Sequence, residues 1–179
     1  KLKGATVFGK IGDESKKSYL ESLGADVIIN YKEKDYKQEM QDLLGADSLS
    51  VSFNAVGGKS LKQDLSLLGP GGRLFLFGGA ELGNRKGLFG KLAFLWEMGL
   101  ILPIGMMMQS KSILGVNMLK IADLQPNIIQ QSMQEMLALY QQGLIRLPQI
   151  QTFNQDAFND AHEALGAGKT TGKVVVMWD

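Results

Sequence analysis

The sequence predicts an α/β fold in which helices pack against a doubly wound parallel sheet. Three observations support this prediction: short apolar runs alternate with amphipathic segments, glycine ends most of them, and several runs are apolar on both faces. Strands that are apolar on both faces are typical of buried parallel sheets. The alternation of strand and helix patterns at this spacing favours right-handed crossovers between parallel strands.

The first two units each consist of a short strand followed by a helix. Asp13 is placed to cap the first helix, and Gly24 and Gly45 are placed to end the first and second helices. The expected elements are a strand at residues 5–9, a helix between Asp13 and Gly24, a strand at 26–30 and a helix at 35–44.

The alternation continues through the rest of the chain. We expect a strand at 49–53, a Gly57-Gly58 turn, a helix at 60–68, a turn at 69–72, strands at 73–77 and 112–116, and an amphipathic helix at 125–142 that Gly143 ends. The C-terminal part predicts a strand at 149–153, a helix at 155–165 and a strand at 173–178.

A nearly continuous apolar segment covers residues 88–108. Lys91 and Glu97 interrupt it, and its longest uncharged run, residues 98–110, has 13 residues. A helix needs roughly 20 apolar residues to cross a bilayer. The segment is therefore interpreted as a buried or interface helix, with contact to a membrane surface as the alternative.

The composition excludes several classes of function. Nineteen Lys and Arg face eighteen Asp and Glu, for a net charge of +1 without a basic run, so we expect no nucleic-acid partner. With no Cys and one His, the sequence predicts no metal site of the thiolate or histidine type. The N-terminus has no pattern of a secretory leader, so the cytoplasm is the expected location.

Ligands of open parallel sheets bind beyond the carboxyl ends of the strands. Those positions here are Gly9–Lys10, Tyr31, residues 54–58 and residues 78–81. Their glycines permit close approach of the backbone to a phosphorylated ligand, although glycine also simply ends strands. The phosphate-binding pattern G-x-G-x-x-G does not occur in the sequence. Either the domain binds no dinucleotide, or the chain begins after this motif. The first strand is expected close to the N-terminus, which favours the second explanation.

Two side chains near the first strand are candidates for the adenosine end of a cofactor. Lys16 is placed to meet a 2′-phosphate, and no acidic residue ends the strand to bind a ribose hydroxyl, which favours NADP over NAD. Tyr31 can stack on adenine. The alternatives are a solvated helix charge for Lys16 and ordinary packing for Tyr31. His162 is interpreted as a structural or surface residue, because no hydrolytic motif accompanies it.

Four stretches together resemble a known family: GKIGDESKKSYLESLGADVIINYKEKD (9–35), SFNAVGGKSL (52–61), LGPGGRLFLFGG (68–79) and AHEALGAGKTTGKVVV (161–176). They are similar to the zinc-free, zeta-crystallin-like quinone oxidoreductases of the medium-chain dehydrogenase/reductase superfamily. Within that branch the chain most resembles the vesicle amine transport protein-like clade, which has a long apolar insertion after the fifth Rossmann strand.

The resemblance implies an NADPH-dependent, metal-free reductase of quinones or enones, in which the cofactor supplies the hydride. It implies a Rossmann-type doubly wound sheet that lacks the first β-α unit. Residues 1–145 would be a partial NADP-binding domain, and residues 146–179 a strand-helix-strand segment of a GroES-like catalytic domain that is otherwise missing. Those two terminal strands would then lack their usual partners.

The resemblance also assigns roles to individual residues, none of them catalytic. Lys16 would meet the adenosine 2′-phosphate and Tyr31 the adenine ribose region. The remaining cofactor contacts would be Val56 and Gly57 at the pyrophosphate and nicotinamide ribose, Phe77, Gly78 and Gly79 at the nicotinamide, and Val116 and Asn117 beyond them, with Lys169 and Lys173 as weaker candidates. One departure concerns the Ser or Thr residues after the second Rossmann strand of the family, which are here Lys10, Gly12 and Asp13.

Two other functions compete with an oxidoreductase. One is a non-catalytic interaction module in which residues 88–108 bind a partner or a membrane surface. A methyltransferase is the weaker alternative, because it needs an acidic residue after its second strand and this sequence does not show one there. Unpaired strand edges invite association, so we expect a homodimer. We also expect the chain to bind NADPH weakly and to reduce no quinone measurably.

Overall fold

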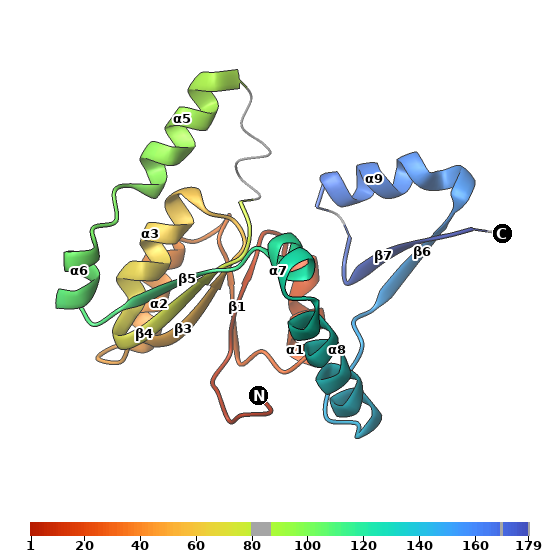
Figure 1. The fold of residues 1–179 in the computed structure, drawn as a ribbon, viewed down its shortest axis with the longest axis horizontal. Helices are drawn as coiled ribbons and strands as arrows, with labels where there is room; N and C mark the ends of the chain where they lie inside the picture. The colour runs from red at the N-terminus through yellow and green to blue at the C-terminus, as the bar shows by residue number, and fades with distance from the viewer. Residues whose placement is uncertain (80–86, 169, 179) are drawn as a thin grey trace. The chain divides into compact units, whose positions relative to one another are not determined.

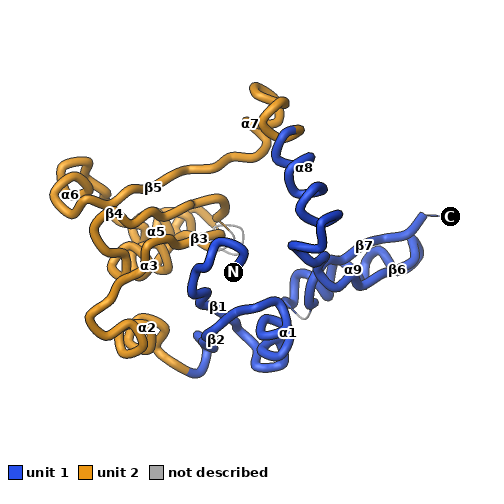
Figure 2. The backbone as a smooth tube through the Cα atoms, turned by 90° about the horizontal axis from the view of Figure 1, so that it is seen from below, with its two compact units in different colours: residues 1–33, 131–179 blue, residues 34–130 orange. Residues whose placement is uncertain are grey.

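The computed structural model describes residues 1–79, 87–168 and 170–178 (Figure 1). It confirms the predicted α/β class, because helices alternate with strands and every strand pair that it describes is parallel. The chain forms two compact units, which we call unit 1 (residues 1–33 and 131–179) and unit 2 (residues 34–130) (Figure 2). The assignment of residues 1–145 and 146–179 to different domains stays a prediction.

The elements of unit 1 are β1 (Phe8–Ile11), the 3-10 helix η1 (Glu14–Lys16), α1 (Lys17–Ser22), β2 (Val27–Asn30), β6 (Ile150–Asn154), the 3-10 helix η2 (Gln155–Ala157), α9 (Phe158–Gly166) and β7 (Lys173–Met177). Those of unit 2 are α2 (Tyr36–Leu44), β3 (Leu49–Asn54), α3 (Gly58–Leu67), β4 (Leu68–Leu76), α5 (Gly87–Met98), α6 (Pro103–Met108), β5 (Ser112–Gly115) and α7 (Met118–Leu124). Helix α8 (Pro126–Gln141) includes the boundary between the units.

The hydrogen-bonded strands form three sheets, β1–β2, β3–β4–β5 and β6–β7. The predicted parallel pairing of the strands is confirmed, and it is divided among these three sheets.

In unit 1 the first strand begins later than predicted, at Phe8 rather than at Ala5. Phe8 pairs with Val27 and Ile11 with Asn30, so the pairing with β2 sets its ends. Gly9 lies against α1, where a Cβ would come within 2.8 Å of Leu20 Cδ2. The missing side chain therefore allows close packing of helix on strand.

The core of unit 2 lies between β3–β4–β5 and α3. Its buried centre is Leu61, Leu68 and Leu74, with Leu49 and Ile113 packed against it. Helices α2 and α5 both pack against α3 (Figure 1). Helix α3 is the described helix that packs on β3 and β4, and the predicted second helix layer stays a prediction.

The predicted turn at residues 69–72 is built into a strand rather than preceding one. Strand β4 already pairs at Leu68 with Leu49, and the next pair is Val51 with Arg73, so the register shifts between them. Gly71 has a φ of 79°, which favours glycine. The Gly-Pro-Gly-Gly segment is therefore an irregularity of the ladder, and its effect on pairing is not visible in the sequence alone.

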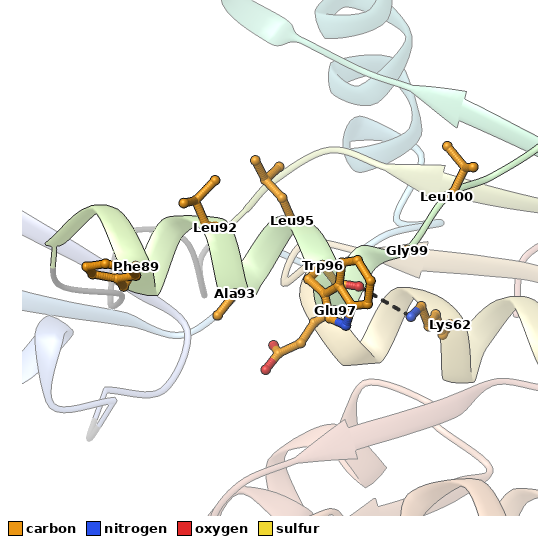
Figure 3. A pocket seen from close by; sticks show the side chains of 9 residues that line it. All are labelled: Lys62, Phe89, Leu92, Ala93, Leu95, Trp96, Glu97, Gly99 and Leu100. Carbon is orange, nitrogen blue, oxygen red and sulfur yellow. Dashed lines mark hydrogen bonds between the residues drawn. The ribbon is translucent and has the colours of Figure 1, made fainter.

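The apolar segment forms two helices, α5 and α6, and not one. Phe94 is the buried side chain of α5, and α6 has none, so most of the segment is exposed. Of the expected buried or interface helix, burial within this chain is limited to Phe94, and an interface role and the membrane-surface alternative stay predictions. An apolar pocket runs along α5 beside Lys62, whose Nζ donates to the carbonyl oxygen of Trp96 at 3.5 Å (Figure 3).

Three further expectations can be compared with the structure. The helix predicted at 125–142 is observed as α8, whereas the short α7 before it was not predicted. The two C-terminal strands were expected to lack their usual partners, and β6 and β7 pair with each other in parallel, with Ile150 opposite Lys173. Helix α9 connects them and packs on both.

Candidate functional site

In unit 1 the turn after β1 lies against Tyr31, which follows β2. A Cβ on Gly12 would come within 2.6 Å of the Tyr31 hydroxyl, so the turn passes directly over the edge of this ring. Lys10 Nζ lies 5.4 Å from the ring centroid, a distance that suits a cation–π contact. Tyr31 itself is half exposed. The ring is thus held in place by its neighbours and still offers surface to a ligand.

Asp13 organises the same turn. Its carboxylate accepts hydrogen bonds from the Ser15 backbone N–H at 2.9 Å and from the Ser15 hydroxyl at 2.7 Å, and it caps η1 as predicted. These hydrogen bonds hold the pKa of Asp13 below its ordinary value, and the charges of Lys16 and Lys32 act in the same direction. The Asp13 carboxylate is therefore held by Ser15 and lies near the ammonium groups of Lys16 and Lys32.

Lys16 is already engaged in unit 1. Its Nζ donates to the carbonyl oxygen of Gly168 at 2.7 Å, just beyond the end of α9. An ammonium group has three N–H donors, so this contact leaves capacity for a phosphate oxygen. Lys173 begins β7 and is exposed, and Lys169 lies outside the described residues.

In unit 2 the predicted residues after β3, β4 and β5 lie in three adjacent turns. The N–H of Phe77 donates to Asn54 O at 3.1 Å, and that of Val116 donates to Leu76 O at 2.8 Å. A Cβ on Gly57 would come within 3.9 Å of the Gly79 Cα, which places these two glycines side by side. Parallel pairing thus gathers the turns at one edge of the sheet, where ligands of such sheets bind.

The turn after β3 is held by the side chain of Asn54. Its Oδ1 accepts hydrogen bonds from the N–H groups of Val56 at 3.1 Å and Gly57 at 2.8 Å. These two amides are therefore satisfied within the protein. Val56 and Gly57 can border a ligand by close contact, but these hydrogen bonds compete with donation from their N–H groups to its phosphates.

The Asn54 amide is in turn part of a buried polar network. Its Nδ2 donates to Asp64 Oδ2 at 2.8 Å, and the Ser52 hydroxyl donates to the same oxygen at 2.9 Å. Tyr36 also shares a hydrogen bond with Asp64, and burial, followed by the charge of Asp64, raises the pKa of the Tyr36 hydroxyl. The Tyr36 hydroxyl therefore stays protonated near neutral pH and acts as the donor.

Helix α5 contacts this turn through its buried aromatic side chain. A Cβ on Gly57 would come within 2.7 Å of Phe94 Cζ, so glycine and ring are in close contact. Gly57 also has a φ of 76° and a ψ of −154°, a conformation that is essentially restricted to glycine. Both the backbone and the neighbour therefore require a glycine here.

The structure thus brings together seven of the nine predicted contact residues in unit 2, namely Val56, Gly57, Phe77, Gly78, Gly79, Val116 and Asn117, and places Lys16 and Tyr31 in unit 1. Asn117 caps α7 by accepting from the Lys120 N–H at 3.1 Å. His162 is exposed with its ring against Phe158, as a surface histidine. The roles of Asp64, Ser52 and Phe94 were not predicted.

The parallel strands with glycine turns at their carboxyl ends define a Rossmann-type domain. The sequence profile described as "Zinc-binding dehydrogenase" matches residues 23–176. This chain belongs to that family, within the medium-chain dehydrogenase/reductase superfamily that its sequence resembles.

Known relatives share the fold over nearly the whole chain. The synaptic vesicle membrane protein VAT-1 homolog of Danio rerio is 24% identical over 173 residues, which are 96% of this chain and 35% of the relative. CurA of Vibrio vulnificus, solved in complex with NADPH, has a TM-score of 0.78 at 24% identity, covering 99% of this chain and 51% of CurA.

The quinone oxidoreductase of Pseudomonas syringae pv. tomato DC3000 has a TM-score of 0.74 at 20% identity, over 97% of this chain and 49% of that one. The chain therefore spans about half the length of these solved structures and about a third of the VAT-1 homolog.

The description of the family names zinc. Zinc in proteins is held by three or four Cys, His, Asp or Glu side chains. No group of three such side chains is placed to hold a metal ion within the part of the chain that the structure describes. The described residues therefore do not fit a zinc ion.

Proposed function

We propose that this chain is the nucleotide-cofactor part of an NADPH-dependent oxidoreductase that reduces conjugated carbonyl compounds, quinones or enones. The observation that carries the proposal is the gathering of the glycine-bearing turns after β3, β4 and β5 at one edge of a parallel sheet. Membership in the dehydrogenase family and the fold shared with an NADPH-bound structure support it. Homodimer formation and a cytoplasmic location are part of the same proposal and rest on the sequence.

When bound, the nicotinamide supplies the hydride, and the protein binds and orients the cofactor. In unit 2 we assign the nicotinamide end to Phe77, Gly78 and Gly79, where backbone without bulky side chains allows close approach. Val56 and Gly57 border the pyrophosphate and ribose by contact. In unit 1 we assign the 2′-phosphate to Lys16 and the adenosine to Tyr31.

Lys16→Ala is expected to weaken NADPH binding by roughly fivefold and to leave NADH binding unchanged. A charge-assisted hydrogen bond contributes about 1.5–3 kcal/mol, and solvent screening and the competing Gly168 carbonyl reduce that value. Titration calorimetry with both cofactors measures the difference. We expect weak binding of NADPH even by the unmodified chain, and no measurable quinone reduction.

Lys17→Ala is the matched control. Lys17 is the next residue and pairs with Glu14 at 3.3 Å on the exposed surface, so its loss removes one positive charge without a predicted phosphate contact. An equal loss of NADPH affinity in both variants would contradict the role of Lys16. No detectable binding of either cofactor by the unmodified chain, even at millimolar concentration, would contradict the proposed function.

A second candidate function is binding to a membrane surface through α5 and α6. By length and composition, Gly87–Met108 is long and apolar enough to cross a membrane, with 22 residues. However, residues 99–102 interrupt the helix, and the 12 residues of α5 span about 18 Å against the roughly 30 Å of a bilayer core. Phe89 and Trp96 are 88% and 85% exposed, which suits an interfacial helix. The VAT-1 relative is named as a synaptic vesicle membrane protein, which agrees with this candidate.

Trp96→Ser is expected to reduce co-sedimentation of the chain with vesicles of neutral and anionic phospholipids by about fivefold or more, because a buried aromatic side chain contributes about 1.5–3 kcal/mol. Trp178→Ser is the control, since Trp178 is 72% exposed and lies outside the apolar segment. If the two variants bind vesicles as well as the unmodified chain does, α5 is not a membrane-binding element.

A further inference from the structure

We propose that Asp64 is a positioning residue, which fixes the orientation of the Asn54 amide and thereby holds the turn at residues 55–57 in its binding conformation. Asp64 touches no predicted cofactor contact itself and acts through Asn54. The inference rests on the proposed function where it concerns the cofactor, while the ordering of the turn is a property of unit 2 alone.

The geometry gives Asn54 a single favourable orientation. Asp64 is a buried carboxylate, which only accepts hydrogen bonds when ionised, so the amide must present its Nδ2 to Asp64 at 2.8 Å. The amide oxygen then faces the turn and accepts from Val56 and Gly57. A reversed amide would place oxygen against oxygen on one side and N–H groups against N–H groups on the other.

The surroundings of Asp64 maintain its role as an acceptor. The Ser52 hydroxyl donates to Oδ2, and Tyr36 supplies a further hydrogen bond from α2. A buried carboxylate is costly unless several donors compensate for its lost hydration. No buried side-chain nitrogen or oxygen of the described residues lacks a partner, so the network is fully satisfied. Its donors and acceptors are consistent with this one arrangement of hydrogen bonds.

The network matters because the turn connects a strand to a helix through a glycine at positive φ. Gly57 has a φ of 76°, and α3 begins at the next residue. Two hydrogen bonds that the Asn54 Oδ1 accepts from Val56 and Gly57 hold the turn in this conformation, and Ser60 adds a third contact by donating to Gly57 O at 2.7 Å. Loss of the Asn54 orientation would therefore free the backbone of the turn while the core around Leu61 stays packed.

An exchange of the two side chains tests the proposal. Asn54→Asp alone places two carboxylates in hydrogen-bond contact in a buried site, and we expect amide hydrogen exchange in the peptide covering residues 55–58 to rise at least tenfold. The double variant Asn54→Asp/Asp64→Asn restores a complementary arrangement. The carboxylate at position 54 accepts from the N–H groups of the turn, and the amide at position 64 donates to that carboxylate. Its exchange is expected to return to within about threefold of the unmodified chain.

Two further variants keep the test informative if Asn54→Asp does not fold. Asp64→Asn alone introduces a second amide, and we expect a threefold to tenfold rise in exchange at the turn. Leu61→Val lowers the stability of α3 packing without touching the network, and we expect a lower melting temperature with unchanged exchange at the turn at a temperature well below melting.

The outcomes separate the two proposals. If the double variant exchanges as fast as Asn54→Asp, or if Leu61→Val loosens the turn as much as Asp64→Asn does, Asp64 has a merely structural role and the inference is overturned. The NADPH affinity of the unmodified chain decides the proposed function independently. Where NADPH binds, its affinity in the single variants is expected to fall as exchange at the turn rises.

Discussion

Phe94→Ala is expected to lower the free energy of unfolding of unit 2 by about 3–5 kcal/mol, the usual cost of truncating a buried phenylalanine. Phe94 is 4% exposed and is the buried residue of α5. Its ring fills the space beside Gly57. Since whole domains are stable by about 5–15 kcal/mol, the loss is large enough to detach α5 from α3. Urea unfolding followed by circular dichroism measures it.

Phe89→Ala provides the matched control on the same helix. Phe89 is almost fully exposed, and surface substitutions usually change stability by less than about 0.5 kcal/mol. Equal destabilisation by both variants would show that α5 does not pack on unit 2 through Phe94. The comparison also tells which face of α5 remains available to a membrane or a partner.

Local signals in the sequence predicted most of the elements. Asp35 caps α2 by accepting from the Gln38 N–H at 2.9 Å, and Gly45 ends that helix with a φ of 59°. Such signals act over three or four residues, so a single sequence reveals them. The ends of β1 and the irregularity of β4 depend on pairing with partner strands, and pairing is set by tertiary structure.

The candidate site likewise contains residues that local signals predict and residues whose roles depend on tertiary structure. The glycine turns could be predicted because they follow strands directly, and their gathering follows from parallel pairing. The role of Asp64 could not, because its partners Ser52 and Asn54 lie 12 and 10 residues away and an aspartate on a helix usually faces solvent. Lys16 was predicted as a phosphate ligand, but its contact with Gly168, 152 residues away, depends on the fold of unit 1.

Phe94 illustrates a further limit of the sequence. Helix α5 is apolar on nearly all sides, so its pattern does not distinguish the face that packs from the face that stays exposed. The structure makes that distinction by placing Phe94 next to Gly57. Together the two residues connect the apolar segment to the proposed cofactor turn.

Gly57→Ala is expected to destabilise unit 2 by about 2–6 kcal/mol and to weaken NADPH binding. A non-glycine residue in this backbone conformation costs about 1–3 kcal/mol. The added Cβ would also lie 2.7 Å from Phe94 Cζ, and overpacking of this kind costs about 1–3 kcal/mol more. Gly45→Ala is the control, because Gly45 also has a positive φ but no atom within 4 Å of an added Cβ.

The contact between the glycine and the ring can be measured by a double-mutant cycle with Phe94→Leu. Leucine keeps the site apolar but is shorter than phenylalanine, so it leaves room for the methyl group at position 57. The double variant is therefore expected to be more stable than the sum of the single effects predicts, by about 1–2 kcal/mol, as is usual for residues in direct contact. Strictly additive effects would mean that backbone strain alone requires the glycine. A favourable coupling would show that α5 is packed against the turn in solution.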